Sequence, residues 1–333
     1  MRTQNRSEVI TTQPADREAA VDTATVPRSV RRRGTPRRIS EPRSDRLLNV
    51  VSVVVLSAIA VSIVYPFVFI ASASLSDPGA VNSGEVVLWP IGVNLDAYQA
   101  ILNYPEIVRG FLNSLLYSGA VMVLGTAIVI AGGYALSRSD LPGRNFFMVV
   151  FVITMLFSGG MIPLYLVAQS LGILNTAWAM ILPSCMSVWQ LIVTRTYFQV
   201  TVPKELLECS QLDGATDFSF FFRVVVPLAK PLIAVNCLLF AVASWNAYFN
   251  ALIYLTDPNL YPLPLVMRNL LIENTYDPSK LTNIDPSQLA QAQQLAAKLK
   301  YALIIIACIP PLVAYPFVQK HFVKGMMLGS LKG

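Results

Sequence analysis

The sequence predicts an all-α, polytopic membrane protein, and its composition and charge spacing are the observations that predict this class. Of the 333 residues, 54% are hydrophobic and only 13% are charged, far from the balance of a soluble domain. Five long windows hold no charged residue, and one membrane-spanning helix needs about twenty mostly apolar residues. The windows cover residues 47–76, 110–137, 145–194, 231–256 and 301–319. Because the window 145–194 is long enough for two spans, we predict six transmembrane helices.

The placement of positive charge orients these spans. Twenty of the 25 Lys and Arg residues fall on one side, in the two tails, the loop with Arg138 and Arg144, and the loop around Glu208. Lys and Arg close to membrane spans are in excess on the cytoplasmic side. Both termini and the Glu208 loop are therefore predicted to be cytoplasmic.

Residues 1–46 are predicted to form a disordered basic tail, and residues 47–333 the six-helix transmembrane domain. The tail holds eleven Arg and six Asp or Glu with almost no large apolar side chains. Its arginine clusters at 31–33 and 37–38 would also suit nucleic acid, but orientation and contact with anionic lipid headgroups explain them beside a span. Membrane lipid is an expected partner and nucleic acid is not.

The second span is predicted to end at about Leu136 and to carry glycines for close packing. Asn113, near its start, is best explained as a helix cap, although bonding to neighbouring backbone is the alternative. Gly125, Gly132 and Gly133 follow, and small residues let membrane helices approach closely. We interpret them as packing residues and not as part of a cofactor loop.

The third span is expected to be interrupted. The third contains Gly159, Gly160 and Pro163, which predict a broken helix. The fourth is predicted as one helix over about residues 177–198.

The fifth span, expected to begin near Pro231, carries polar and aromatic side chains that are costly in lipid. Asn246 and Asn250 are predicted to share one helical face. Amides can bond sugar hydroxyls and aromatic rings can cover sugar rings, so one interpretation is a substrate path. The other is that these residues bond neighbouring helices together. The residues concerned are Asn236, Trp245, Asn246, Tyr248 and Asn250.

A polar loop between the fourth and fifth spans is predicted to form a helix, a glycine turn and a second helix. Pro203 favours a helix start, and Gly214 can take the left-handed backbone conformation that ends a helix. The second helix is expected over about residues 217–222, ending before Pro227.

The spacing in this loop resembles the EAA loop of the permease subunits of ABC importers. In that family a Glu and two small residues are followed by three variable positions and a Gly. Nine more positions then precede an aliphatic residue, a variable one, an aliphatic residue and a Pro. Cys209 and Ser210 replace the usual two alanines, and both are small. The matching positions are Glu208, Gly214, Val224, Val226 and Pro227.

Other runs resemble carbohydrate-type permeases, and together they cover nearly all of residues 47–333. The Phe-Ser-Gly-Gly-x-Ile-Pro run at 157–163 is similar to a subgroup associated with polysaccharides and complex oligosaccharides. The resemblance implies a type I importer permease of the maltose-transporter kind in a bacterial plasma membrane. It implies as partners a second permease subunit, a dimer of ATPase subunits and an extracytoplasmic sugar-binding protein.

The resemblance also implies which residues couple the permease to the ATPase. Glu208 would fix the loop by charge or capping, Asp213 would bond backbone at the turn, and Gly214 would permit the turn. The coupling residues expected on this basis are Glu208, Asp213, Gly214, Ala215 and Pro227.

Two other functional classes need material that the sequence lacks or places elsewhere. An ion-coupled carrier of a small polar solute is the main alternative, but it would normally hold a carboxylate inside a span, and the five windows contain none. A membrane enzyme would need a catalytic or metal site, and His321 is the only histidine. The chain has no G-x-x-x-x-G-K-[ST] loop, so ATP hydrolysis is assigned to another polypeptide, and no cofactor is expected.

Overall fold

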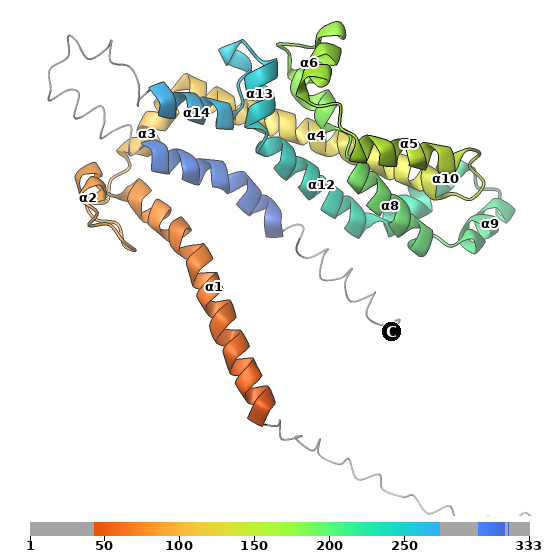
Figure 1. Ribbon diagram of the computed structural model, residues 1–333, viewed down its shortest axis with the longest axis horizontal. Coiled ribbons are helices and arrows are strands. Elements are labelled where there is room, and N and C mark those ends of the chain that lie inside the picture. Colours follow the sequence, from red (N-terminus) through yellow and green to blue (C-terminus); the bar gives the residue numbers. More distant parts are fainter. Residues whose placement is uncertain (1–42, 274–298, 317–318, 320–333) are drawn as a thin grey trace, which may run out of the picture. The chain divides into compact units, whose positions relative to one another are not determined.

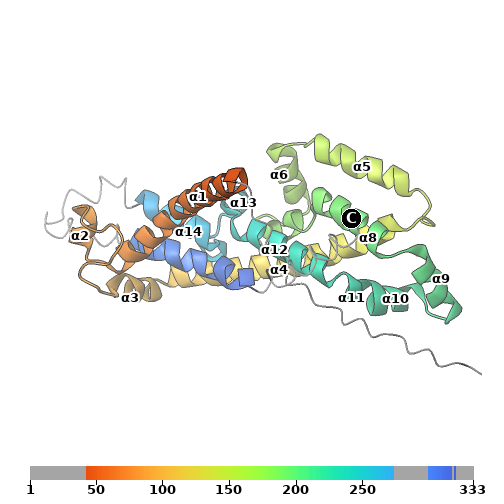
Figure 2. The ribbon, with the colours of Figure 1, turned by 90° about the horizontal axis from the view of Figure 1, so that it is seen from below.

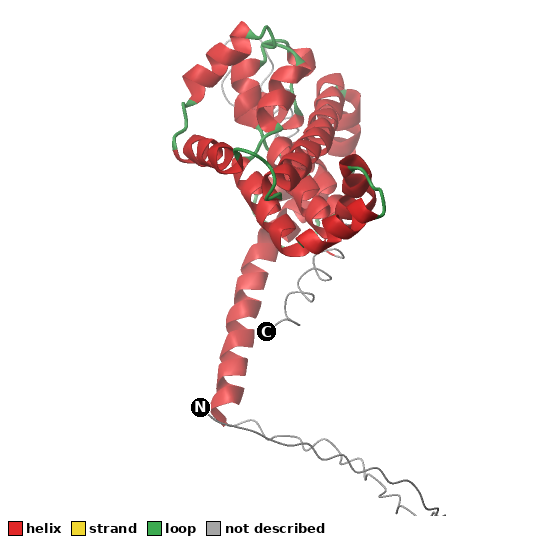
Figure 3. Ribbon diagram, turned by 90° about the vertical axis from the view of Figure 1, so that its right-hand side faces the viewer, coloured by secondary structure: helices red, strands yellow, loops and turns green. Residues whose placement is uncertain are grey.

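The computed structural model describes residues 43–273, 299–316 and 319, and all regular structure in this part of the chain is helical (Figure 1, Figure 3). The first elements are α1 (Arg43–Leu75), α2 (Pro78–Asn82), α3 (Asp96–Asn103), α4 (Pro105–Ser137), α5 (Arg144–Leu156), α6 (Met161–Ser170), α7 (Ala177–Ile181), η1 (Leu182–Ser184) and α8 (Val188–Thr201). The others are α9 (Lys204–Leu212), α10 (Asp217–Phe220), η2 (Phe221–Val225), α11 (Val226–Leu228), α12 (Lys230–Trp245), α13 (Tyr248–Tyr254), η3 (Pro258–Leu260), α14 (Leu263–Glu273) and the helix Leu299–Pro316.

The predicted tail meets the described residues at α1. This helix already includes residues 43–46, which the sequence assigns to the tail, while residues 1–42 lie outside the described part. The chain divides at Ser57 into two units, and the second contains every described element after α1.

Helices long and apolar enough to cross a membrane confirm the predicted class. Within the described residues, three do so singly: Asp45–Leu75, Pro105–Ser137 and Leu299–Pro316. Three helix pairs satisfy the same criteria jointly, with bends of 117° between α5 and α6, 44° between α7–η1 and α8, and 78° between α10–α11 and α12. Counting each bent pair as one span gives six.

Two of these bends bear on the sequence predictions. The break between α5 and α6 is confirmed: Gly160 has a φ of 83°, and its N–H donates to the Ser158 hydroxyl (Figure 2). The prediction of one helix over 177–198 is wrong, because the chain passes through η1 and bends before α8. Pro183 lies at this break, where it has no N–H to give the preceding turn, and the Ser187 side chain caps α8.

The helix α4 is the element against which the second unit packs. It contacts α12, α8 and α14, and buries Tyr117, Val121 and Val129 in a core shared with Phe240 of α12 (Figure 1). The predicted close approach at its glycines is confirmed. A Cβ at Gly133 would lie 2.6 Å from Cγ2 of Thr194 in α8.

Gly133→Ala is expected to lower the stability of the α4–α8 contact by about 1–3 kcal/mol, because overpacking forces side chains and backbone apart. Gly119→Ala is the matched control, since a Cβ at Gly119 meets no atom within 4 Å. Thermal unfolding of the purified protein in detergent would compare the two variants. Equal melting temperatures would contradict the close-packing role of Gly133.

The other end of α4 holds the chain that follows α13. Asn113 Nδ2 donates to the backbone oxygens of Asn259 at 2.8 Å and Tyr261 at 3.1 Å. Asn113 lies inside α4, which begins at Pro105, and its amide bonds a different segment, so the helix-cap prediction is wrong. Its amide fastens a loop more than a hundred residues away in sequence, through backbone oxygens that sequence alone does not bring near it.

Candidate functional site

The segment of residues 204–228, here called the α9–α10 unit, lies with the start of α5 at one end of α4, opposite α3 and α14 (Figure 1, Figure 2). Its first helix follows Pro203, as predicted, and ends in a left-handed turn at Gly214, whose φ is 77°. The Gly214 N–H donates to Gln211 O at 3.0 Å, and the Ala215 N–H donates to Ser210 O at 2.9 Å. These two bonds form a Schellman motif, which satisfies helix-end carbonyls and needs a residue that tolerates positive φ.

The second helix of the unit is longer than predicted. Thr216 caps it, with its hydroxyl accepting the Ser219 N–H, and the helix then continues from Asp217 to Leu228. The prediction that it ends before Pro227 is wrong. The Val226 N–H donates to Phe221 O, five residues earlier, so the helix widens into a π turn just before the proline. A wider turn relieves the clash that a proline ring makes with the preceding turn.

An aromatic cluster packs the α9–α10 unit against the transmembrane helices. Phe220 and Phe198 are each 1% exposed, and the Tyr134 ring of α4 lies 5.8 Å from Phe198 and 5.2 Å from Phe221, between ring centroids. Aromatic pairs at such distances stabilise a contact beyond their buried area. The second helix is thereby attached to both α4 and α8.

Arg138, the residue that caps the C-terminus of α4, adds a polar connection at the same place. Its Nε and Nη2 donate to the Asp140 carboxylate at 2.9 and 2.5 Å, and its Nη1 donates to Asp217 Oδ1 at 2.8 Å. Hydrogen bonding to Arg138 lowers the pKa of Asp140 below its ordinary value, and the bonds to Asp140 and then Asp217 raise the pKa of Arg138. The end of α4 is therefore tied to the first residue of α10.

Two of the expected coupling residues do not make the bonds predicted for them. The Glu208 and Asp213 carboxylates make no hydrogen bond or ion pair with the described residues, so the bonds predicted for them are absent there. The Schellman bonds already use the turn N–H groups that Asp213 would need. Glu208 lies in the middle of α9, away from the N–H groups at its start. It lines a cavity of about 470 Å³ between α9 and the end of α4, together with Lys204 and Arg144.

The outer surface of the α9–α10 unit is open and partly apolar. Leu212 is 89% exposed and Phe218 is 78% exposed. Asp213, Gly214 and Pro227 are also exposed, and Ala215 is half-buried. Large exposed apolar side chains beside a polar turn are typical of a protein-docking surface.

The fifth-span residues do not form one helical face. The helix α12 ends at Trp245, Asn246 caps it by donating from Nδ2 to Val242 O at 2.9 Å, and α13 begins at Tyr248. The prediction that Asn246 and Asn250 share one helix face is therefore wrong. The amide of Asn246 bonds the backbone of its own last turn, which ends the helix between the two asparagines.

The structure brings Trp245, Asn246 and Tyr248 to one cavity of about 710 Å³ and places the other two residues elsewhere. Asn236 is buried and donates to Thr194 Oγ1 at 3.1 Å, so it bonds α12 to α8. Asn250 is half-buried in α13 and does not line that cavity.

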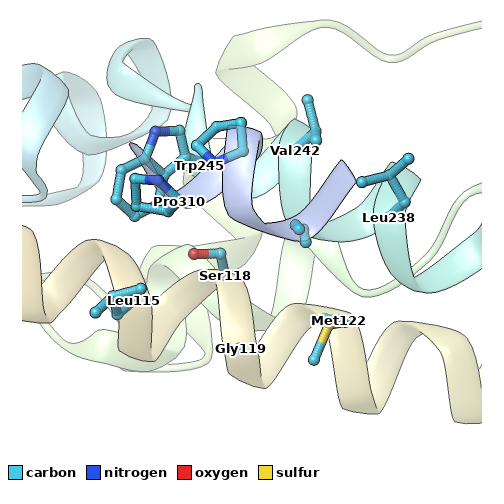
Figure 4. Close-up of a pocket in the computed structure, with 11 residues that line it drawn as sticks. Leu115, Ser118, Gly119, Met122, Leu238, Val242, Trp245 and Pro310 are labelled. Carbon is cyan, nitrogen blue, oxygen red and sulfur yellow. The ribbon is translucent and has the colours of Figure 1, made fainter. Parts of the chain in front are cut away.

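A second, smaller cavity of about 220 Å³ lies against Trp245. Figure 4 shows it with Trp245 and Pro310 on one side and Leu115 and Ser118 of α4 on the other. Its lining is almost wholly aliphatic, so it offers a sugar few hydrogen bonds. The larger cavity is the better candidate for a polar ligand.

Comparison with known proteins identifies the family. Residues 137–328 match the family described as "Binding-protein-dependent transport system inner membrane component". The chain belongs to this family. The matched residues include the whole α9–α10 unit and the fifth-span residues.

Several members of this permease family are similar over most of their length. Protein LplC of Bacillus subtilis (strain 168) is 36% identical over 295 residues, which cover 87% of this chain and 97% of LplC. The polygalacturonan/rhamnogalacturonan transport system permease protein YtcP of the same strain is 38% identical over 293 residues, 87% of this chain and 99% of YtcP. A chain in the crystal structure of a bacterial ABC transporter involved in the import of the acidic polysaccharide alginate has a TM-score of 0.77. The two chains are 29% identical, and the alignment covers 85% of this chain and 99% of the other.

Sequence reasoning missed the residues that attach the α9–α10 unit to the rest of this permease. Arg138 entered the prediction only as a positive charge that orients the spans, Asp217 only as the start of the second short helix, and Tyr134 did not enter it. The one available signal was an Arg placed directly after the second span with Asp140 two residues later. The partner at Asp217 lies 79 residues away along the chain, so the pairing becomes visible only in the fold.

Proposed function

We propose that this chain is the transmembrane permease subunit of an ATP-driven importer that moves a sugar, as an oligosaccharide or polysaccharide fragment, into the cytoplasm by alternating access. The observation that carries the proposal is the family match over the α9–α10 unit and the fifth span. Relatives named as carbohydrate transport permeases support the substrate class. An ion-coupled carrier has no such support.

The proposed partners follow from what the chain contains and what it lacks. Its sequence has no phosphate-binding loop, so a dimer of separate ATPase subunits would hydrolyse ATP and the chain itself would not be an enzyme. A second permease subunit would complete the path, and the family description names a binding protein that would deliver the sugar. The excess of Lys and Arg supports a cytoplasmic position for the α9–α10 unit and both termini, in a bacterial plasma membrane among its lipids.

The geometry supports a route from the ATPase to the spans. An ATPase subunit that docks on α9 would contact Leu212 and the exposed turn at Asp213 and Gly214. The turn connects α9 to α10, and Arg138 and Tyr134 connect α10 to α4. Because α4 packs against α12, α8 and α14, a movement of α10 reaches most of the second unit.

Affinity purification of the tagged chain from its native membranes tests this proposal. We expect an ATPase with a phosphate-binding loop and a second polytopic protein to co-purify, and labelled oligosaccharide uptake by these membranes to require ATP. Recovery of the chain alone in mild detergent, together with uptake driven by an ion gradient, would favour the carrier alternative.

A further inference from the structure

The 710 Å³ cavity beside Trp245 has the size and form of a ligand site. Its volume falls within the roughly 300–1,000 Å³ typical of small-molecule pockets. One wall is the helix Leu299–Pro316, and a second is α14, which presents Pro264, Met267 and Arg268 on one face. The third wall is the junction of α12 and α13, with Trp245, Asn246 and Tyr248, and Phe67 of α1 also lines the cavity.

The charge in this cavity is unbalanced. Among the described residues that line it, Arg268 alone is charged. Arg268 is half-buried and forms no ion pair with any described residue, and its Nη1 makes a 3.4 Å hydrogen bond to Oδ1 of the neighbouring Asn269. A half-buried guanidinium in a mostly apolar cavity is costly unless it is paired, and its other N–H donors make no hydrogen bond with a described residue. The arrangement suits an anion that a ligand supplies.

The neutral lining around Arg268 matches a sugar that carries such an anion. Tyr248 is 44% exposed and can cover the apolar face of a sugar ring, and Trp245 also lines the cavity, with its indole N–H already donated to Ala307 O. The Asn246 Nδ2 is used within α12, so its Oδ1 remains to accept a sugar hydroxyl. The guanidinium fork matches the geometry of a carboxylate, which it can bind through two parallel hydrogen bonds.

We propose that this cavity binds an acidic, carboxylate-bearing oligosaccharide and that Arg268 pairs with its carboxylate. The inference rests on the proposed importer function and deepens it by naming the substrate class and the residue that selects it. A neutral sugar would leave Arg268 without a counter-charge, and the cavity would then lose part of the free energy of binding to the unpaired guanidinium.

Uptake of two labelled probes by cells that produce the chain tests this proposal: trigalacturonate, which is acidic, and galactotriose, its neutral counterpart. Arg268→Gln is expected to raise the half-saturating concentration of trigalacturonate by at least about tenfold, as expected for hydrogen bonds to charged groups. Any galactotriose uptake should stay unchanged. Arg268→Lys should be intermediate because Lys keeps the charge without the fork. Lys300→Gln, which removes a charge outside the cavity, is the matched control and should behave as wild type.

Membrane levels of each variant are measured by immunoblot, and co-purification of the ATPase shows that the complex still assembles. Unchanged trigalacturonate uptake by Arg268→Gln would overturn the proposal. An equal fall for both sugars at normal membrane level would also overturn it, and would point to a general role such as binding a lipid phosphate. If the wild-type chain takes up galactotriose but not trigalacturonate, the acidic site is rejected and the importer function stands. The same holds if it takes up neither probe while the ATPase still co-purifies. If no ATPase co-purified with the wild-type chain, the importer function itself would be rejected.

Discussion

Gly214→Val is expected to abolish transport while the chain still inserts in the membrane. Gly214 has a φ of 77°, and a left-handed conformation costs an L-residue roughly 1–2 kcal/mol, with more for a β-branched side chain. No atom lies within 4 Å of an added Cβ, so the backbone conformation and not a clash is the cause. The Schellman bonds that end α9 would be lost, and with them the placement of Leu212 and the link to α10. Oligosaccharide uptake and co-purification of the ATPase would both be measured.

Gly172→Val is the matched control, because the chain repeats the same turn after α6. Gly172 has a φ of 67°, no atom within 4 Å of an added Cβ, and the same pair of bonds, from its own N–H to Gln169 O and from Ile173 N–H to Ala168 O. Both variants carry the same local cost, so only Gly214→Val should lose the ATPase. Gly214→Asn should retain part of the activity, since Asn tolerates the left-handed region. If the ATPase were held equally by both valine variants, the α9–α10 unit would not be the docking element.

The features that the sequence predicted correctly are those that depend on neighbouring residues. The turn at Gly214 follows from a glycine that can take the left-handed conformation at the end of a short helix, and the close approach at Gly133 follows from a small residue in an apolar span. The break at Gly160 follows from paired glycines before a proline. Each is a local backbone or steric requirement, which a single residue type can reveal.

The features that sequence reasoning missed depend on which of several bonds a side chain makes in the fold. The Asn246 amide bonds to the last turn of α12, so that helix ends before Asn250, whereas a periodicity argument assumes an unbroken helix. Asn113 has backbone acceptors near it only because the loop after α13 lies against α4. Arg138 pairs with Asp217 because the fold brings α10 to the end of α4. Such pairings follow from tertiary packing, so sequence spacing does not predict them.

Arg138→Ala is expected to uncouple ATP hydrolysis from transport, with the ATPase still bound to the chain. Arg138 makes three charge-assisted hydrogen bonds that fasten the end of α4 to Asp140 and Asp217. The two carboxylates are 59% and 61% exposed, so after allowance for solvent we expect about 0.5–2 kcal/mol for the two pairs, which is roughly two- to thirtyfold in the population of the attached state. Transport per ATP hydrolysed in reconstituted vesicles should fall by about that factor.

Arg144→Ala is the matched control, because it removes an equal charge close to Arg138. Among the described residues, Arg144 makes only a 3.3 Å bond to the Arg138 backbone oxygen, so transport per ATP hydrolysed should stay near wild type in this variant. Equal losses in the two variants would show that surface charge, and not the Arg138 connection, carries the effect.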